Sequence, residues 1–382
     1  MRDLVVVGGG IVGAACAYYA ARAGLAVTVL DRGTPGGGTT SRGEGNILVS
    51  DKGAGPELEL ALASRRLWLD LATEHGPDRF ELEEKGGLVV ALSEPGLATL
   101  DTFTAGQRDA GVVVEPVSAD RLHDHEPHLA SDLPGGVRYP QDLQVQPVLA
   151  AATLLAAARR AGAHVVSGEE VVGATHGGDG RITSVHTDRA TYDCEAAVNA
   201  AGTWAGSVGE RLGGPVPVLP RRGFVLVTEP LPRVVRHKVY TADYVENVAS
   251  DEAGLETSAV VEGTRAGPVL IGASRERVGF DRSLSVDVLT LLAGQAVRLF
   301  PFLRDIRLLR SYAGFRPYCP DHLPMIGPDP RVPGLFHACG HEGAGVGLAP
   351  ATGRLVIELL TGAHPLVDPT PFAPARLVEA PA

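Results

Sequence analysis

Three glycines near the N-terminus have the spacing of a phosphate-binding turn. Gly8, Gly10 and Gly13 fit the pattern G-x-G-x-x-G, and Asp31 follows roughly 20 residues later. In such a turn the first glycine allows a sharp bend, the second lets backbone approach a pyrophosphate, and the third lets a helix pack on a strand. The Asp31 carboxylate is placed to accept a hydrogen bond from a ribose 2′-OH. The pattern predicts a dinucleotide site and does not by itself separate NAD from FAD.

The segments around this turn have the composition that such a site requires. Residues 4–7 form a continuous apolar run typical of a strand buried on both faces, and residues 14–23 favour a helix. Residues 26–30 indicate a second strand. This order directs the first helical N–H groups, those of Ile11 and Val12, towards bound phosphates. The simpler alternative is a glycine-rich turn before an ordinary helix, and the register of strand, helix, strand and acid disfavours it.

Composition narrows the class of protein. The chain has 382 residues, which is enough for about two domains. Its net charge of −11 disfavours a nucleic-acid partner, because phosphate binding requires a basic surface. The four cysteines form no C-x-x-C pair and no metal-ligand spacing, so we expect no metal site and a reducing, cytoplasmic location.

The N-terminus also invites comparison with a signal peptide, since Arg2 precedes an apolar segment. The glycine triplet interrupts that segment and Asp3 weakens the basic start, so the strand–turn–helix interpretation is favoured. No later apolar run is long enough to suggest a membrane span.

The rest of the chain predicts a part with both helices and strands, followed by a part made mostly of short strands. Helices are expected over residues 56–76, 97–110, 119–125, 147–161, 286–300 and 349–360. Residues 80–93 have strand character, as do short segments between 164 and 200 and residues 335–339. From Pro215 onwards, short strands separated by turns indicate a mostly antiparallel sheet, hence a second domain. After Arg310 the sequence is again rich in small residues and predicts loops.

Several loops rich in small residues suggest backbone close to a ligand. One includes Thr40, Ser41, Gly45 and Asn46, and another follows a predicted strand at Ala201-Gly202. A third runs through residues 314–327 and continues at residues 340–347. A flexible surface loop is the plainer interpretation of the first of these segments taken alone.

Taken jointly, four blocks make the chain resemble the D-amino-acid-oxidase-like family of FAD oxidoreductases, which includes glycine oxidase, sarcosine oxidase and D-hydroxyproline dehydrogenase. The blocks are residues 8–31; Thr40-Ser41 with Gly45; residues 199–204; and residues 314–327 with 340–343. The resemblance spans essentially the whole chain. It implies an α/β fold with a Rossmann-like FAD-binding domain of the glutathione-reductase type (1–78, 147–214 and 311–382). A substrate domain (79–146 and 215–310) would be built on a mostly antiparallel sheet with helices.

The resemblance implies FAD rather than NAD, held without a covalent bond. Cys319 lies in a block where some relatives tether flavin, but it matches no tethering position. The residues implied in cofactor binding are Gly8, Gly10, Ile11, Val12, Gly13, Asp31, Arg32, Thr40, Ser41, Gly45, Asn46, Val171, Ala201, Gly202, Arg316, Gly340, Gly343, Ala344, Gly345, Val346 and Gly347. Residues 343–347 are expected to precede the last helix and to direct N–H groups at the flavin N1–C2=O locus.

The resemblance also implies a substrate site. Arg316 in Gly-Phe-Arg-Pro matches the position where an arginine binds the amino-acid carboxylate, against the plainer alternative of a surface ion pair. Hydride transfer from the α carbon to flavin N5 would then give an imine. His341 is expected to line the flavin, and the alternative is that it assists the reaction as a catalytic residue. Tyr240 and Tyr244 are expected to supply a hydroxyl or a lid, with packing an equal alternative.

The expected function is therefore FAD-dependent oxidation of the C–N bond of a small amino or imino acid, such as a D-amino acid, glycine, sarcosine or D-proline. Alternatives are a flavin enzyme acting on a 2-hydroxy acid or biosynthetic intermediate, and a flavin subunit of a heteromeric amine dehydrogenase. The electron acceptor, oxygen or a quinone, and the homo- or hetero-oligomeric state are left open by the sequence.

Overall fold

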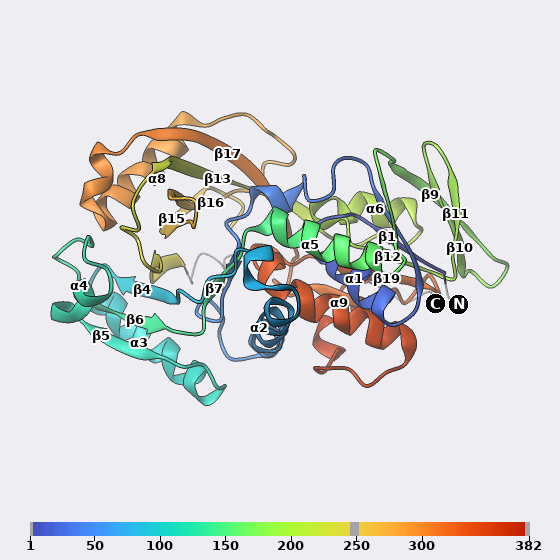
Figure 1. The fold of residues 1–382 in the computed structure, drawn as a ribbon, viewed down its shortest axis with the longest axis horizontal. Helices are drawn as coiled ribbons and strands as arrows, with labels where there is room; N and C mark the ends of the chain where they lie inside the picture. The colour runs from blue at the N-terminus through green and yellow to red at the C-terminus, as the bar shows by residue number, and fades with distance from the viewer. Residues whose placement is uncertain (1–2, 245–251, 379–382) are drawn as a thin grey trace.

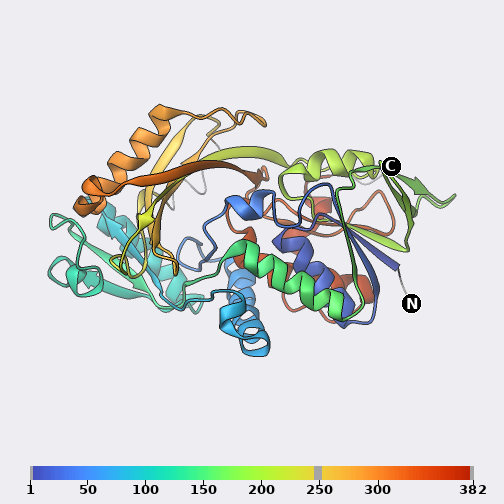
Figure 2. The same cartoon turned by 45° about the horizontal axis from the view of Figure 1, so that its top comes forward.

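The computed structural model describes residues 3–244 and 252–378. It has two parts, each built on one main sheet (Figure 1). The part on the right of Figure 1 carries both ends of the chain, and the part on the left is formed by the middle of the sequence. The turned view in Figure 2 shows the long strands β13 (Leu219–Pro230) and β17 (Leu308–Tyr318) reaching from the second part towards the first.

The first sheet has the order β18-β19-β12-β1-β2-β8, and all its neighbours run parallel except β18 and β19. Its strands are β1 (Asp3–Val7), β2 (Ala26–Asp31), β8 (His164–Ser167), β12 (Ala196–Asn199), β18 (Met325–Pro328) and β19 (Leu335–Cys339). Strand β1 is buried on both faces, because Leu4 and Val6 enter one core while Val5 and Val7 enter another. The parallel α/β fold class predicted from the sequence is confirmed.

Helices cover one face of this sheet, and a small antiparallel sheet covers the other. The helical side holds α1 (Ile11–Arg22), α2 (Pro56–His75), α5 (Pro147–Arg160) and α9 (Gly345–Thr361). The opposite side holds β9 (Val171–His176), β10 (Ile182–Thr187) and β11 (Thr191–Asp193), together with α6 (Ala205–Arg211). Helices α1 and α9 come from opposite ends of the chain and pack side by side (Figure 1).

The second sheet has the order β17-β13-β16-β15-β14-β4-β6-β5, in which only the β14–β4 pair is parallel. Its other strands are β4 (Gly87–Ala91), β5 (Glu115–Ser118), β6 (Gly135–Tyr139), β14 (Lys238–Thr241), β15 (Glu256–Gly263) and β16 (Pro268–Arg275). Helix α8 (Val286–Leu299) covers one face through Val288 and Leu292. The other face shares its core with the first part through Tyr240 and Val260. The expected, mostly antiparallel second sheet is confirmed.

Smaller elements connect the two parts. A two-stranded sheet joins β3 (Asn46–Ile47) to β7 (Leu143–Gln144). Two further helices are α3 (Glu94–Asp109) and α4 (Leu122–His125). The 3-10 turns within residues 3–244 and 252–378 are η1 (Thr39–Arg42), η2 (Pro77–Arg79), η3 (Ala119–Arg121), η4 (Gly202–Trp204), η5 (Pro301–Asp305), η6 (Thr370–Phe372) and η7 (Pro374–Arg376). The division into domains stays a prediction, and β17 crosses its boundary at residues 310 and 311.

Three local predictions are wrong. The loop expected after Arg310 is strand β17, which tolerates Pro317 because β17 is the edge strand of its sheet. The strand expected over residues 80–93 is limited to β4. The last helix begins at Gly345 rather than at residue 349, so Gly345 and Gly347 lie in its first turn, while Gly343 precedes the helix as expected. Glycine and proline near its start hid this turn, because both disfavour helix on propensity alone.

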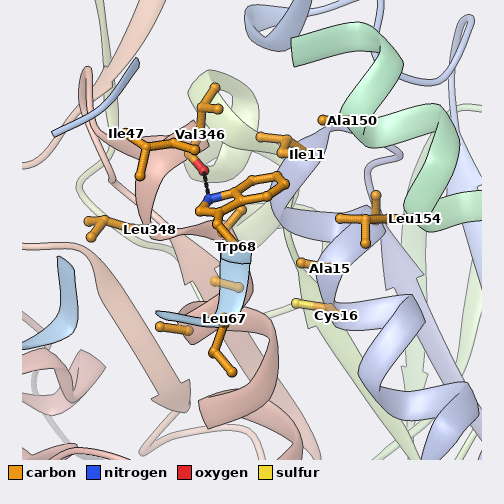
Figure 3. Close-up of a cluster of buried hydrophobic side chains, with 14 of the residues drawn as sticks. Ile11, Ala15, Cys16, Ile47, Leu67, Trp68, Ala150, Leu154, Val346 and Leu348 are labelled. Carbon is orange, nitrogen blue, oxygen red and sulfur yellow. Dashed lines mark hydrogen bonds between the residues drawn. The ribbon is translucent and has the colours of Figure 1, made fainter. Parts of the chain in front are cut away.

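Side chains of α2 donate hydrogen bonds to backbone carbonyls in the first turn of α9. Pro350 lies inside α9 and has no N–H to donate to the carbonyl of Val346 four residues earlier. The indole Nε1 of Trp68 donates to Val346 O at 3.1 Å, as Figure 3 shows, and also to Gly347 O at 3.2 Å. The Ser64 hydroxyl donates to Gly347 O at 2.6 Å. Side chains of α2 therefore supply the hydrogen bonds that Pro350 removes.

We predict that Trp68→Phe lowers the free energy of unfolding by about 1–3 kcal/mol, because it leaves a buried carbonyl with fewer donors. Denaturant unfolding measures this change. Pro350→Ala restores a backbone N–H at the position that faces Val346 O, so the Trp68→Phe cost should shrink in the Pro350→Ala background. An equal cost in both backgrounds would show that Trp68 acts by packing alone.

Candidate active site

A cavity of about 530 Å³ runs between the two parts of the molecule. Its walls come from the turn after β1, the end of β2, the η1 segment, the start of α9 and strands β13, β14 and β17 of the second sheet. Most of the residues predicted for the site line it: Gly8, Gly10, Ile11, Val12, Asp31, Arg32, Thr40, Gly45, Asn46, Val171, Ala201, Gly202, Tyr244, Arg316, His341, Gly343, Ala344, Gly345, Val346 and Gly347.

Four predicted residues lie outside the lining of this cavity: Gly13, Ser41, Tyr240 and Gly340. Gly13 is a packing residue, since a Cβ there would overlap Gly8 O. The Ser41 hydroxyl donates within its own turn, to Gly37 O at 2.9 Å and Gly38 O at 3.0 Å. Gly340 lies against Cys319, with a left-handed φ of 75°.

The glycine turn brings backbone to the cavity. Gly8 has a φ of 108°, and a Cβ there would lie 2.5 Å from Ala200 O, so only glycine fits without displacing β12. Helix α1 begins directly after the turn, with no side-chain cap from its N-cap residue Gly10. The Ile11 N–H donates to Thr40 Oγ1 at 3.0 Å. Thr40 therefore fixes the η1 segment against the helix start, where the positive end of the helix dipole faces the cavity.

Asp31 lines the cavity and also has a structural role. Its carboxylate accepts hydrogen bonds from the N–H groups of Gly9 and Gly33, each at 2.8 Å. These bonds tie the glycine turn to the end of β2. Beside it, the Arg32 guanidinium stacks 4.3 Å above the Trp204 ring. The sequence did not single out Trp204 as a site residue, although it directly follows the predicted Ala201–Gly202 loop.

The residues fit a long dinucleotide such as FAD. The helix starts of α1 and α9 both face the same cavity, and neither has a side-chain cap. Gly347 lets α9 approach the chain at Ile47, where a Cβ would lie 3.3 Å from its Cα. One helix start suits the pyrophosphate, and the other suits negative charge on the ring system. Cys319 does not line the cavity, and non-covalent attachment stays a prediction.

Arg316 lines the cavity from β17 of the second sheet, whereas Asp31 lines it from the end of β2 in the first sheet. Its Nη1 donates to Ser274 O at 2.8 Å, and it forms no ion pair with any carboxylate among residues 3–244 and 252–378. Gly223 makes room for it, because a Cβ there would overlap Nη1. Burial lowers the pKa of Arg316, and the positive charge of Arg275 lowers it further. The guanidinium is thus held in place with its charge unmatched.

The two predicted tyrosines have different positions. Tyr244 lines the cavity, and its ring lies 5.0 Å from the Arg275 Cζ. Tyr240 is fully buried, and its hydroxyl donates to Ser50 Oγ at 2.6 Å. The two rings meet edge to face at 5.0 Å. Tyr240 therefore supports Tyr244 from behind, as packing, while Tyr244 faces the cavity.

His341 is buried and lines the cavity near the start of α9. Its Nε2 lies 2.9 Å from the hydroxyl of Thr352. Burial lowers the pKa of His341 to about 3, so the ring is neutral at physiological pH. A neutral, hydrogen-bonded imidazole suits a lining role better than proton transfer.

Sequence reasoning did not single out several charged residues of the lining, among them Glu44, Lys238 and Glu342. Lys238 was read only as part of a strand. A lysine beginning the apolar run Lys-Val-Tyr is a signal that could have identified it, because lysine is seldom fully buried without a function. Glu342 has a left-handed φ of 46° and accepts from His322 at 2.8 Å.

No group of three His, Cys, Asp or Glu side chains within residues 3–244 and 252–378 could hold a metal ion. In the same ranges, no helix is both long and apolar enough to cross a membrane.

Comparison with known proteins identifies the family. The model of the FAD dependent oxidoreductase family matches residues 3–359. The chain is 31% identical to glycine oxidase of Geobacillus kaustophilus over 98% of the chain and 97% of that protein. It is 30% identical to hydrogen cyanide synthase subunit HcnC of Pseudomonas aeruginosa, over 100% of the chain and 97% of that protein.

Solved structures agree. The crystal structure of glycine oxidase from Geobacillus kaustophilus superposes with a TM-score of 0.88 at 29% identity, covering 100% of both chains. That of L-proline dehydrogenase from P. horikoshii gives a TM-score of 0.89 at 23% identity, over 98% of this chain and 97% of that one, and shows the shared fold. The chain belongs to the family of FAD-dependent oxidoreductases. The predicted family and the predicted cofactor, FAD, are confirmed. The predicted enzyme class, a flavin oxidoreductase that acts on C–N bonds, is also confirmed.

We predict that His341 makes the protein less stable in acid. Its unfolded imidazole binds a proton near pH 6.5 and the buried one only near pH 3, so the unfolded state binds more protons between these values. Stability should fall as pH drops below 6.5, by at most about 1.4 kcal/mol per pH unit. Unfolding of wild type and His341→Gln between pH 7 and 4.5 measures this contribution.

His364→Gln is the matched control, because His364 is exposed. The His341→Gln profile should be flatter than that of the wild type, and the His364→Gln profile should not. Identical slopes for all three proteins would contradict a buried, neutral His341.

Proposed function

We propose that this chain oxidises the C–N bond of a small amino or imino acid, giving an imine. The observation that supports it most directly is Arg316. Its guanidinium lines the cavity without a carboxylate partner among the described residues, on the side of the helix start at Gly343–Gly345. A fixed, planar donor with unmatched charge is suited to bind a substrate carboxylate through two parallel hydrogen bonds.

The chain's own residues position and shield the substrate. Arg316 is held by Ser274 O and Gly223, so its guanidinium does not need to reorganise when a carboxylate binds. Tyr244 and the neutral His341 line the cavity and exclude water. When bound, FAD supplies the acceptor for the two electrons and the hydrogen that leave the α carbon as the C=N bond forms. The substrate nitrogen loses its proton, and no residue with a suitably shifted pKa is needed for this step.

The relatives support the same substrate class. Glycine oxidase and L-proline dehydrogenase are named for an amino acid and an imino acid. HcnC is named as a subunit of hydrogen cyanide synthase, which favours a second candidate: a flavin subunit of a heteromeric enzyme. This second candidate would be favoured if the isolated chain binds FAD but does not turn over substrate.

Anaerobic mixing tests the proposal. The purified protein should be yellow, and a panel of glycine, sarcosine, D-proline, D-alanine and their acidic homologues should include members that bleach the flavin. Comparing the rates at which air and a quinone reoxidise the reduced flavin then identifies the electron acceptor. Absence of bleaching by the whole panel, with flavin bound and the protein monodisperse, would remove this substrate class. Co-purification with a second chain that restores bleaching would favour the heteromeric candidate.

We predict that Arg316→Met raises KM for the substrate at least a hundredfold while FAD stays bound, because the carboxylate loses a charge-assisted, two-point contact. Steady-state kinetics and the flavin absorbance of the purified variant measure the two effects. Arg310→Met is the matched control: Arg310 lies on the same strand but is exposed. Unchanged kinetics in Arg316→Met would exclude Arg316 from substrate binding.

A further inference from the structure

The charged side chains at the Arg316 end of the cavity do not balance one another. Lys52 is paired with Asp51 at 2.7 Å, and Glu342 is paired with Arg221 at 3.5 Å. Two other arginines of the lining, at positions 42 and 282, are exposed to solvent. The buried or partly buried charges that remain without an ion-pair partner among the described residues are Arg316, Lys238 and Glu44.

Lys238 is the least expected of these. Its side chain is buried, with 2% of the residue exposed, and its Nζ has no hydrogen-bond partner among residues 3–244 and 252–378. The ammonium lies 5.6 Å from the ring centres of both Tyr240 and Tyr244. Glu262 is opposite Lys238 on β15, but its carboxylate accepts from Gln144 instead. The Lys238 side chain reaches the cavity, so a ligand can provide the contact that the protein does not.

Lys238 remains charged in this environment. Burial by itself lowers the pKa of Lys238, but Tyr244, Glu44 and Glu262 raise it above its ordinary value. A buried, charged ammonium without a direct partner is costly, and such groups are concentrated at functional sites. The positive charge of Arg275, whose Nη1 also lacks a described partner, adds to the local excess.

We propose, resting on the function proposed above, that the substrate is an amino or imino acid with two carboxylates. Arg316 binds the carboxylate next to the reacting carbon, Lys238 binds the second carboxylate, and Glu44 faces the substrate nitrogen. Arg275 does not line the cavity, so the lining itself presents two unmatched positive charges and one negative charge. This set is complementary to a ligand with two carboxylates and one ammonium. A substrate with a single carboxylate would leave Lys238 without a partner.

Binding of compounds that cannot be oxidised tests this inference apart from turnover. Succinate and glutarate should bind the flavin-loaded protein at least tenfold more tightly than butyrate and valerate, as measured by calorimetry and by the shift of flavin absorbance. Equal affinities for the two classes would overturn the inference. This comparison uses the wild-type protein, so it does not depend on the folding of any variant.

Variants at Lys238 locate the second contact. Lys238→Met should abolish the preference for dicarboxylates and leave butyrate binding within about twofold, while Lys238→Arg should retain part of the preference. Lys85→Met is the matched control, because Lys85 also lies near Glu262 but bonds Gln144 and Gly263 O outside the cavity. If Lys238→Met weakens butyrate and succinate equally, Lys238 shares one carboxylate with Arg316 and the inference is wrong.

Turnover separates this inference from the proposed function. Aspartate and glutamate of both hands and iminodiacetate should bleach the flavin at lower concentration than alanine and sarcosine. Bleaching by alanine or sarcosine with no gain from the second carboxylate would retain the proposed function and reject the inference. Tight dicarboxylate binding with no bleaching by any amino or imino acid would reject the proposed function instead.

Discussion

The site depends on a close backbone contact between the two ends of the chain. A Cβ on Gly353 of α9 would lie 2.6 Å from the carbonyl carbon of Ala15 and 2.8 Å from the N of Cys16, both in α1. Glycine and alanine at this crossing let the two helices approach closely. Since both helices begin at the cavity, this contact directs two positive helix ends into one site. Replacing either small residue with a larger one would move apart the two helix starts that line the cavity.

The rest of the architecture protects this arrangement. Strand β1 is buried between two cores, which fixes the turn from which α1 begins. Trp68 and Ser64 of α2 satisfy the carbonyls at the start of α9, where Pro350 removes a helical hydrogen bond. A helix start with exposed amides is therefore held rigidly without a side-chain cap. Such preorganised donors cost no further ordering when negative charge arrives.

On the side of the cavity formed by the second sheet, charged side chains are left without an ion-pair partner among the described residues. Arg316 and Lys238 both reach the cavity from the second sheet, and the protein satisfies neither with a carboxylate among its described residues. Pairing them internally would improve stability but occupy the groups that recognise a ligand. Under the proposed function, the first part of the molecule would hold the cofactor, while Lys238 of β14 and Arg316 of β17 would contact the substrate.

The sequence by itself determined the dinucleotide turn, the parallel sheet and most helices, because glycine spacing and apolar runs are local properties. It did not reveal that α9 begins at Gly345 or that Gly314–Pro317 is part of a strand, since tertiary pairing overrides the propensities of glycine and proline there. That Lys238 and Glu44 line the cavity is visible only in three dimensions. Whether a charge is paired depends on neighbours distant in sequence, so only the tertiary structure could decide which charges in the cavity remain unpaired.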